Sequence, residues 1–333
     1  MEVFTLVFKH LISNSFYPVP HPAIGVGSAF EGWSPREDDV VYRMFIPLSS
    51  PRGFDFHLEL DTAGQMPGRN FRIHVKPVCI CNSEQEDNNV PCLLHHSKEE
   101  LQNQGPTLLD TLCTGFYLDV QKTAHWFYQL VKKTWVVLPQ SKKWRLVLMP
   151  ISRSCKFKVT RATESYVVEV LFGVQRGDSD IFVSCQNIEA LFTPRTVWPE
   201  TYAVAEAKFF RHIAEWAPHD SMHCQCLQLY ARLLVGSGFS TYTLKTIVMR
   251  HFVPRMKDIL EYLRRSVKEK CLEHFIVGNK VLHQNIILPL DIKTADPHNL
   301  FHHLEHDLLT YTKMRNEFCY LQNRLIVMLL SGR

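Results

Sequence analysis

Residues 25–41 read GVGSAFEGWSPREDDVV and lead into an alternating run of β-forming residues. Gly27 and Ser28 predict a tight turn whose free backbone N–H groups and hydroxyl suit phosphate oxygens. Glu37 and Asp39 are two residues apart at the start of a predicted strand, so their side chains point to one face. Two adjacent carboxylates are the hard oxygen ligands that a magnesium ion bridging nucleotide phosphates requires. The alternative interpretation is a polar loop that enters an edge strand.

Strands and helices are mixed in the first part of the chain. Predicted strands cover 39–48, 54–61, 71–81, 144–151, 155–160, 166–175 and 180–185, and helical spacing covers 107–137. From residue 202 onward the pattern is mainly helical, over 202–216, 223–235, 240–251, 256–275 and 311–329. Ser240 or Thr241 is expected to cap one of these helices. The order predicts an α+β chain, with a mixed-sheet core over residues 1–195 and an all-helical lobe over 196–333.

The composition excludes several classes of protein. Of the 333 residues, 46% are hydrophobic and 21% charged, which is unlike a disordered, collagen-like or coiled-coil chain. No apolar run approaches the roughly 20 residues of a membrane span. Lys9 and His10 interrupt the first apolar run, so we expect neither a signal peptide nor a transmembrane segment in this sequence. The ten cysteines leave the redox compartment open.

Positive charge is concentrated between residues 120 and 163, where the sequence contains no Asp or Glu. Such a stretch would attract an anionic ligand or partner, and the alternative is a solvated surface. Sequence-specific nucleic-acid binding is not expected. The ten basic residues are Lys122, Lys132, Lys133, Lys142, Lys143, Arg145, Arg153, Lys156, Lys158 and Arg161.

Glu169 is the lone acid in a strongly apolar predicted strand, YVVEVLF at 166–172. A buried carboxylate is costly unless a cation, a metal or an edge position compensates it. One interpretation is a third metal ligand that converges with Glu37 and Asp39. The other is a salt bridge to a neighbouring basic strand, through Lys156 or Lys158.

A second group of potential ligands consists of Cys79, Cys81, Cys92 and His95. We expect Cys79 and Cys81 to share a strand face, and Cys92 and His95 have a spacing typical of a hairpin. Three thiols and an imidazole are a ligand set for structural zinc. A disulfide from Cys92 to either strand cysteine and plain apolar packing are the alternatives.

The order of these motifs resembles a known family. Gly27-Ser28, then Glu37-x-Asp39, then a strand acid at Glu169 is similar to the Mab-21 and cyclic-GMP-AMP-synthase-like nucleotidyltransferases. Within them the chain resembles the inositol trisphosphate receptor-interacting protein-like branch over roughly residues 17–333. The segments that carry the resemblance are PAIGVGSAFEGWSPR (22–36), LLDTLCTG (108–115), YLDVQKTA (117–124), TYAVAEAKFFRHIA (201–214), CLQL (226–229) and FSTYTLKT (239–246).

The resemblance implies a nucleotidyltransferase core followed by a helical lobe. It implies that Glu37, Asp39 and Glu169 occupy the metal-binding positions, for magnesium or manganese if the site is active, with Gly27 and Ser28 at the nucleotide. Two departures weaken the case for an enzyme. The third acid of the active enzymes is usually Asp, and Glu169 is one methylene longer, which displaces its carboxylate. The zinc ribbon of the cyclic-GMP-AMP synthase is also not evident.

Two functions therefore remain. The first is a non-catalytic, membrane-tethered interaction protein that modulates a receptor, with the inositol trisphosphate receptor as the candidate partner. The second is an active metal-dependent nucleotidyltransferase, and we place it behind the first. Full-length members of the resembled branch carry a membrane-spanning segment before this domain. The resemblance therefore implies a single-pass membrane location, and a cytoplasmic location is the alternative.

Overall fold

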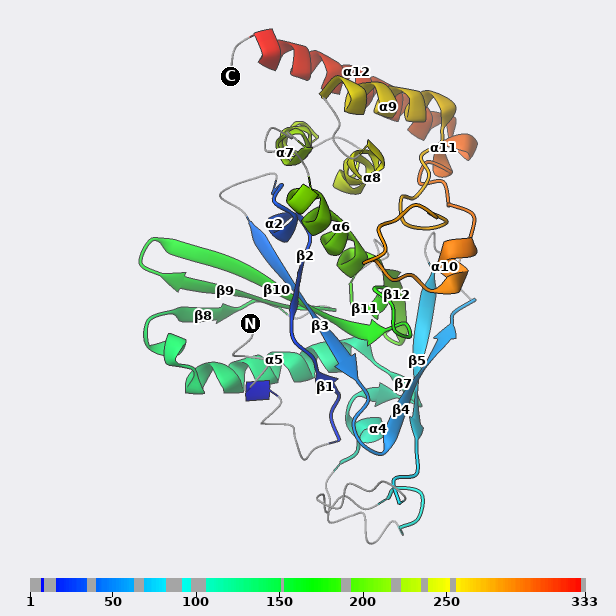
Figure 1. The fold of residues 1–333 in the computed structure, drawn as a ribbon. Helices are drawn as coiled ribbons and strands as arrows, with labels where there is room; N and C mark the ends of the chain where they lie inside the picture. Colours follow the sequence, from blue (N-terminus) through cyan, green and yellow to red (C-terminus); the bar gives the residue numbers. More distant parts are fainter. Residues whose placement is uncertain are drawn as a thin grey trace. The chain divides into compact units, whose positions relative to one another are not determined.

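The chain divides into two compact units. Residues 1–26 and 41–204 form the sheet unit, and residues 27–40 and 205–333 form the helical unit. The computed structural model in Figure 1 describes residues 7–8, 16–34, 40–62, 69–81, 92–96, 106–150, 153–186, 193–216, 223–234, 239–251 and 256–330.

Within the described residues, the sheet unit contains a twelve-stranded mixed sheet. Its main order is β1-β3-β10-β11-β12-β5-β7-β6, with β2 on β3, β4 on β5, β9 on β10 and β8 on β9. The strands are β1 Val19–Pro20, β2 Ile24–Val26, β3 Val41–Ser49, β4 Phe54–Leu60, β5 Asn70–Pro77, β6 Cys113–Thr114, β7 Tyr117–Leu118, β8 Arg145–Leu148, β9 Cys155–Arg161, β10 Glu164–Gln175, β11 Phe182–Ser184 and β12 Val197–Thr201. With the helices described below, this arrangement confirms the α+β class.

Strand β10 is the longest strand in the described part of the chain, and it pairs with three others. It runs parallel to β3 and antiparallel to β9 and β11. Gly173 lies at its contact with β11, where a Cβ atom would come 2.1 Å from the carbonyl oxygen of Val183. Only a residue without a side chain fits this approach.

Helix α5, Val120–Val137, covers one face of this sheet (Figure 1). Asp119 caps it, because its carboxylate accepts the backbone N–H groups of Gln121 at 2.8 Å and Lys122 at 3.0 Å. The aromatic ring of Phe127 stacks on that of Phe172 in β10, with ring centroids 5.7 Å apart. The helix ends before Pro139, which starts the short 3₁₀ helix η2, Pro139–Lys142, and disfavours helical geometry in the residue before it. The short helix α4, Leu108–Thr111, precedes α5 in sequence.

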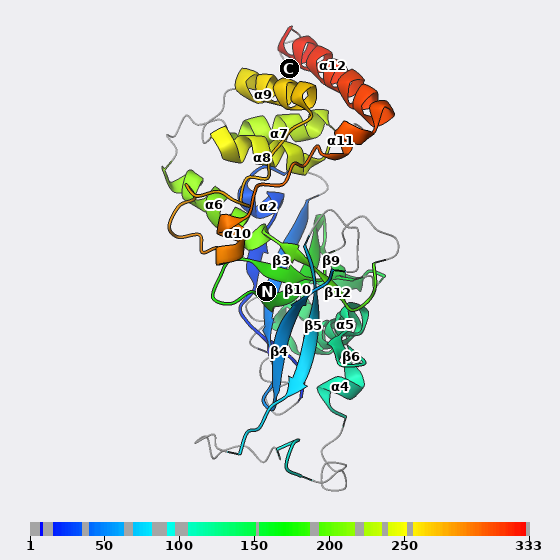
Figure 2. The same cartoon turned by 90° about the vertical axis from the view of Figure 1, so that its right-hand side faces the viewer.

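The helical unit is built on four packed helices, α7, α8, α9 and α12 (Figure 2). Their contact surface is apolar, and Tyr230, Ile247, Leu263 and Leu321 are all buried. The helices of this unit are α2 Ser28–Glu31, α6 Ala203–Trp216 (which begins at the boundary), α7 His223–Leu233, α8 Thr241–His251, α9 Met256–Glu269, α10 Leu290–Thr294, α11 His303–His306 and α12 Leu308–Leu330. Among the described residues, no helix has both the length and the apolarity to cross a bilayer.

The structure decides three details that the sequence left open or placed differently. Ser240, rather than Thr241, caps α8, because its hydroxyl accepts the backbone N–H of Thr243 at 3.2 Å. The helix predicted over 256–275 ends at Glu269, where Lys270 adopts a left-handed conformation with φ 54°. The strand predicted over 71–81 ends at Pro77, so Cys79 and Cys81 follow the strand.

Candidate functional site

The turn at Gly27 has the tight geometry that its sequence predicts. Gly27 adopts φ 79° and ψ −178°, a conformation that is almost confined to glycine. Its carbonyl oxygen accepts the backbone N–H groups of Phe30 and Glu31, each at 3.0 Å. Gly32 then ends the short helix α2 with φ 80°. Nucleotide binding by Gly27 and Ser28 stays a prediction.

The carboxylate pair of Glu37 and Asp39 lies outside the described residues. Its convergence with Glu169 therefore also stays a prediction. Glu169 itself lies in the described part of β10, and its contacts show what compensates its charge.

Glu169 is paired on both carboxylate oxygens. Arg43 of β3 donates from Nε to Oε2 at 3.0 Å, and the hydroxyl of Ser154 donates to Oε1 at 3.0 Å. The side chain of Glu169 is 19% exposed. The salt-bridge interpretation is thus the one observed, with Arg43 in place of the expected Lys156 or Lys158. The reason is the parallel register, which sets Arg43 directly beside Glu169.

This pairing bears on the metal that the resemblance implies. A carboxylate that binds an arginine and a serine hydroxyl is already neutralised and hydrogen-bonded. Each carboxylate oxygen keeps a second lone-pair site beside this contact, so metal binding by Glu169 stays a prediction.

A buried charge cluster, unrecognised in the sequence, lies in the helical unit. Lys245 of α8 donates to Glu31 Oε1 at 2.6 Å and to Glu206 Oε2 at 2.5 Å. The indole N–H of Trp33 donates to the other oxygen of Glu31 at 2.7 Å. The exposed fractions of the Glu31, Lys245 and Glu206 side chains are 0%, 7% and 8%.

Burial and charge compete in this cluster. Burial raises the pKa of Glu31, against the opposing effect of the Lys245 ammonium. For Lys245, burial alone would lower the pKa, but the carboxylates of Glu206 and Glu31 raise it above its ordinary value. Lys245 therefore stays charged at neutral pH, and it joins α8 to α6 and to the segment after Gly27. The sequence did carry a signal for this cluster: Glu206 and Lys245 are charged residues within apolar helical stretches, and charged residues are rarely fully buried unless they are paired. Apolar periodicity alone does not reveal which residues pair.

The basic stretch 120–163 is divided between two faces of the sheet. Helix α5 packs on the face that carries Phe172. Glu169 is three residues away along β10 and points to the opposite face, together with its cross-strand neighbour Lys156. The lysines of α5 and those of β9 therefore lie on opposite sides of the sheet. The two groups of lysines do not share one face of the sheet, and an anionic ligand at residues 120–163 stays a prediction.

One of the ten basic residues is structural. Arg153 is buried and donates to the carbonyl oxygens of Cys185, Pro194 and Val197. Desolvation lowers its pKa. This guanidinium fastens its own segment to the main chain at Cys185 and at residues 194–197 of the sheet unit, and it is not available to a ligand.

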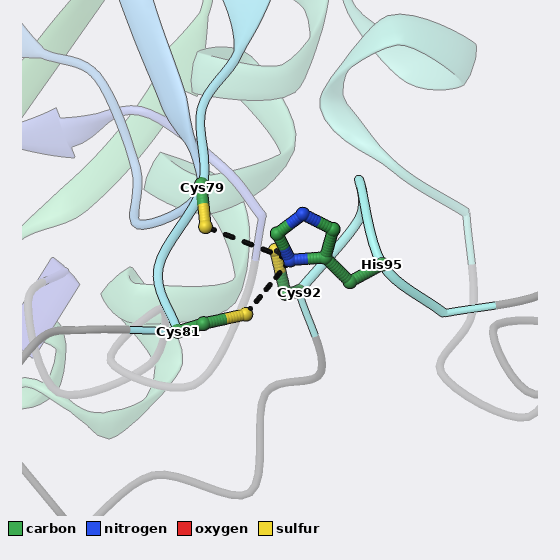
Figure 3. A group of neighbouring side chains, drawn as sticks. All are labelled: Cys79, Cys81, Cys92 and His95. Atoms are coloured by element: carbon green, nitrogen blue, oxygen red, sulfur yellow. Dashed lines mark hydrogen bonds between the residues drawn. The ribbon is translucent and has the colours of Figure 1, made fainter.

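The four residues proposed as zinc ligands come together in the sheet unit (Figure 3). Cys79 and Cys81 follow β5, and Cys92 begins a turn in which the N–H of His95 donates to the Cys92 carbonyl at 3.2 Å. The three sulfurs and one ring nitrogen of His95 all lie within 4.8 Å of one another. This is the convergence expected of a metal site, and the binding of zinc itself stays a prediction.

Hydrogen bonds distinguish the three thiols. The pKa of Cys92 is lowered to about 6, chiefly because the backbone N–H of Ile80 donates to its sulfur. The pKa of Cys81 is raised to about 11, chiefly by its hydrogen bond with Cys92. The cluster thus favours one thiolate, at Cys92.

No family model matches the chain. The chain is similar to inositol trisphosphate receptor-interacting proteins. It is 29% identical to inositol 1,4,5-trisphosphate receptor-interacting protein-like 1 of Rattus norvegicus over 329 residues, covering 91% of this chain and 60% of the relative. It is 27% identical to inositol 1,4,5-trisphosphate receptor-interacting protein of Danio rerio, covering 88% and 61%, and 27% identical to that of Homo sapiens, covering 84% and 57%.

The chain spans about three-fifths of the length of the curated relatives it matches. The similarity supports the resemblance drawn from the motifs, at the level of receptor-interacting proteins. The activity and partners of the whole protein are proposals.

Proposed function

We propose that this chain is the interaction domain of a protein that modulates a receptor, with the inositol trisphosphate receptor as the candidate partner. The observation that carries the proposal is the similarity, over about nine-tenths of the chain, to proteins named for interaction with that receptor. A closer likeness to the like-1 type, within the Mab-21 group of nucleotidyltransferase folds, belongs to the same proposal. So does a single-pass membrane location, with a cytoplasmic one as the alternative.

The state of Glu169 supports a non-catalytic role. Transfer of a nucleotidyl group depends on closely placed metal ligands, and a displaced carboxylate weakens them. Glu169 carries an extra methylene and is held by Arg43 and Ser154. An interaction domain needs only the fold to persist, and an internal ion pair serves that purpose.

The alternative is a magnesium- or manganese-dependent nucleotidyltransferase whose acids are Glu37, Asp39 and Glu169. The glycine-specific turn at Gly27 favours this alternative, because its geometry matches the predicted phosphate turn. In that case Ser28 would lie at the nucleotide and the acids would hold the metal, which would supply charge neutralisation for the transferred phosphate.

One experiment separates the two functions. The purified chain is tested for binding to the inositol trisphosphate receptor, and for product formation from ATP and GTP with magnesium or manganese. The double variant Glu37→Gln with Asp39→Asn is compared with a charge-matched control, Asp178→Asn with Glu215→Gln, which changes two exposed acids. We expect receptor binding in all three proteins and turnover in none.

Two results would contradict the proposal. Metal-dependent product formation that the double variant abolishes and the control retains would establish the enzyme. Absence of receptor binding by the wild-type chain would remove this receptor as the partner of the domain.

A further inference from the structure

The end of β5 and the turn at residues 92–96 bring four soft ligands to one point. In the described structure, His95 Nδ1 lies 3.6 Å from the sulfur of Cys79, 3.0 Å from that of Cys81 and 3.7 Å from that of Cys92. Around a tetrahedral zinc ion, bonds of about 2.0–2.3 Å set neighbouring ligand atoms about 3.5–3.8 Å apart. The separations from Cys79 and Cys92 fall in this range, and the separation from Cys81 is shorter, so the Cys81 sulfur would move outward on binding.

We propose that Cys79, Cys81, Cys92 and His95 bind one zinc ion in a closed, tetrahedral structural site. Three thiolates and one imidazole are a complete ligand set of the kind found in structural zinc sites. No position is left open for a water or substrate, so the site holds structure together and performs no catalysis. This inference is independent of the proposed receptor partner.

The main chain around the cluster supports a bound metal. The backbone N–H groups of Ile80 and Leu94 both donate to the Cys92 sulfur. Such donors satisfy the remaining lone pairs of a metal-bound thiolate and orient it. In Figure 3 the imidazole of His95 presents Nδ1 to the sulfurs of Cys79 and Cys81, while its other nitrogen points away from them.

The exposure of the cluster also argues for a function of these side chains. Cys79, Cys81 and His95 are exposed, so burial of apolar surface does not explain why they gather. Three thiols are also one more than a disulfide can use. A zinc ion would use all four groups and fasten the turn at 92–96 to the end of β5, where Val78 donates to the Gly53 carbonyl at 2.9 Å.

The first test uses the whole wild-type chain, purified in a reducing buffer. Metal analysis by mass spectrometry should find one zinc per chain. Replacement of zinc by cobalt(II) should produce the visible absorption bands of tetrahedral cobalt with thiolate ligands. Removal of the metal with a chelator should expose three additional thiols to a colorimetric thiol reagent and lower the thermal unfolding midpoint.

Variants then assign the ligands. Cys81→Ser and His95→Ala, both at exposed positions, should lose stoichiometric zinc and the cobalt spectrum. Cys319→Ser alters an exposed cysteine on α12 and should retain both. Two outcomes would overturn the proposal: a wild-type chain without stoichiometric zinc or a tetrahedral cobalt spectrum, or a disulfide within the cluster in the reduced preparation. If a variant fails to fold, the thiol count of the wild-type chain with and without chelator still decides.

Discussion

The ammonium of Lys245 donates to the carboxylate of Glu31 at 2.6 Å, between residues that are 214 positions apart in the sequence. Glu206 accepts from the same ammonium at 2.5 Å, and all three side chains are buried. One buried cation therefore compensates two buried carboxylates. Without the cation, these two like charges would repel each other. This relationship connects α8, α6 and the segment after Gly27 inside the helical unit.

Removal of the cation should strongly destabilise the protein. Lys245→Met leaves the carboxylates of Glu31 and Glu206 buried and uncompensated, and we expect a loss of about 3–5 kcal/mol in the free energy of unfolding. Urea unfolding followed by circular dichroism measures it. Lys257→Met, which removes an exposed lysine of α9, is the control and should change stability by less than about 0.5 kcal/mol. Equal effects of the two substitutions would contradict a role for the cluster in stability.

His274 should make the protein less stable in mild acid. Its pKa is lowered to about 3, chiefly by burial, and further by the nearby His298 and Arg250. Its Nδ1 accepts the backbone N–H groups of Ile276 and Val277 at 3.2 Å, which requires the neutral ring.

The sign of this effect follows from proton uptake. Because the folded-state pKa is below the unfolded value of 6.5, only the unfolded chain takes up a proton as the pH falls. The contribution of neutral His274 to the free energy of unfolding is fully present above pH 6.5. It should decline by about 1.4 kcal/mol per pH unit as the pH falls from 6.5 toward 3. Unfolding measured from pH 7.5 to 4.5 tests this. His274→Gln should flatten the slope, whereas His125→Gln, at an exposed position, should not.

Gly173 should not tolerate a methyl group. The Cβ of Gly173→Ala would lie 2.1 Å from the Val183 carbonyl, so β10 and β11 would have to separate. We expect a loss of about 1–3 kcal/mol in unfolding free energy. Ser165→Ala, at an exposed position of the same strand, is the control. A fully stable Gly173→Ala protein would contradict the close packing of these two strands.

The ion pair of Arg43 and Glu169 should be measurable and independent of magnesium. A double-mutant cycle with Arg43→Met and Glu169→Gln should give a coupling energy of up to about 1 kcal/mol, because the Arg43 side chain is 41% exposed. Added magnesium should shift the thermal midpoints of the wild type and of Glu169→Gln equally. A magnesium-dependent stabilisation that requires Glu169 would instead favour the metal-ligand interpretation.

Local patterns predicted most of the elements. The alternation of apolar residues located β3, β9 and β10, and the hydroxyl of Ser240 marked the start of α8. Both depend on neighbours within a few residues, which sequence spacing records directly. The spacing of Cys79, Cys81, Cys92 and His95 likewise predicted a group that the structure brings together.

The sequence by itself determined the α+β class, the change to helices after residue 202 and the identity of the four candidate zinc ligands. Only the tertiary structure decided which cation faces Glu169, because Arg43 becomes its neighbour through the parallel pairing of strands 126 residues apart. The same holds for Lys245, whose carboxylate partners lie 39 and 214 residues away in the sequence. Electrostatic energy depends on distance in space, and residue spacing fixes that distance only within a single helix, strand or turn.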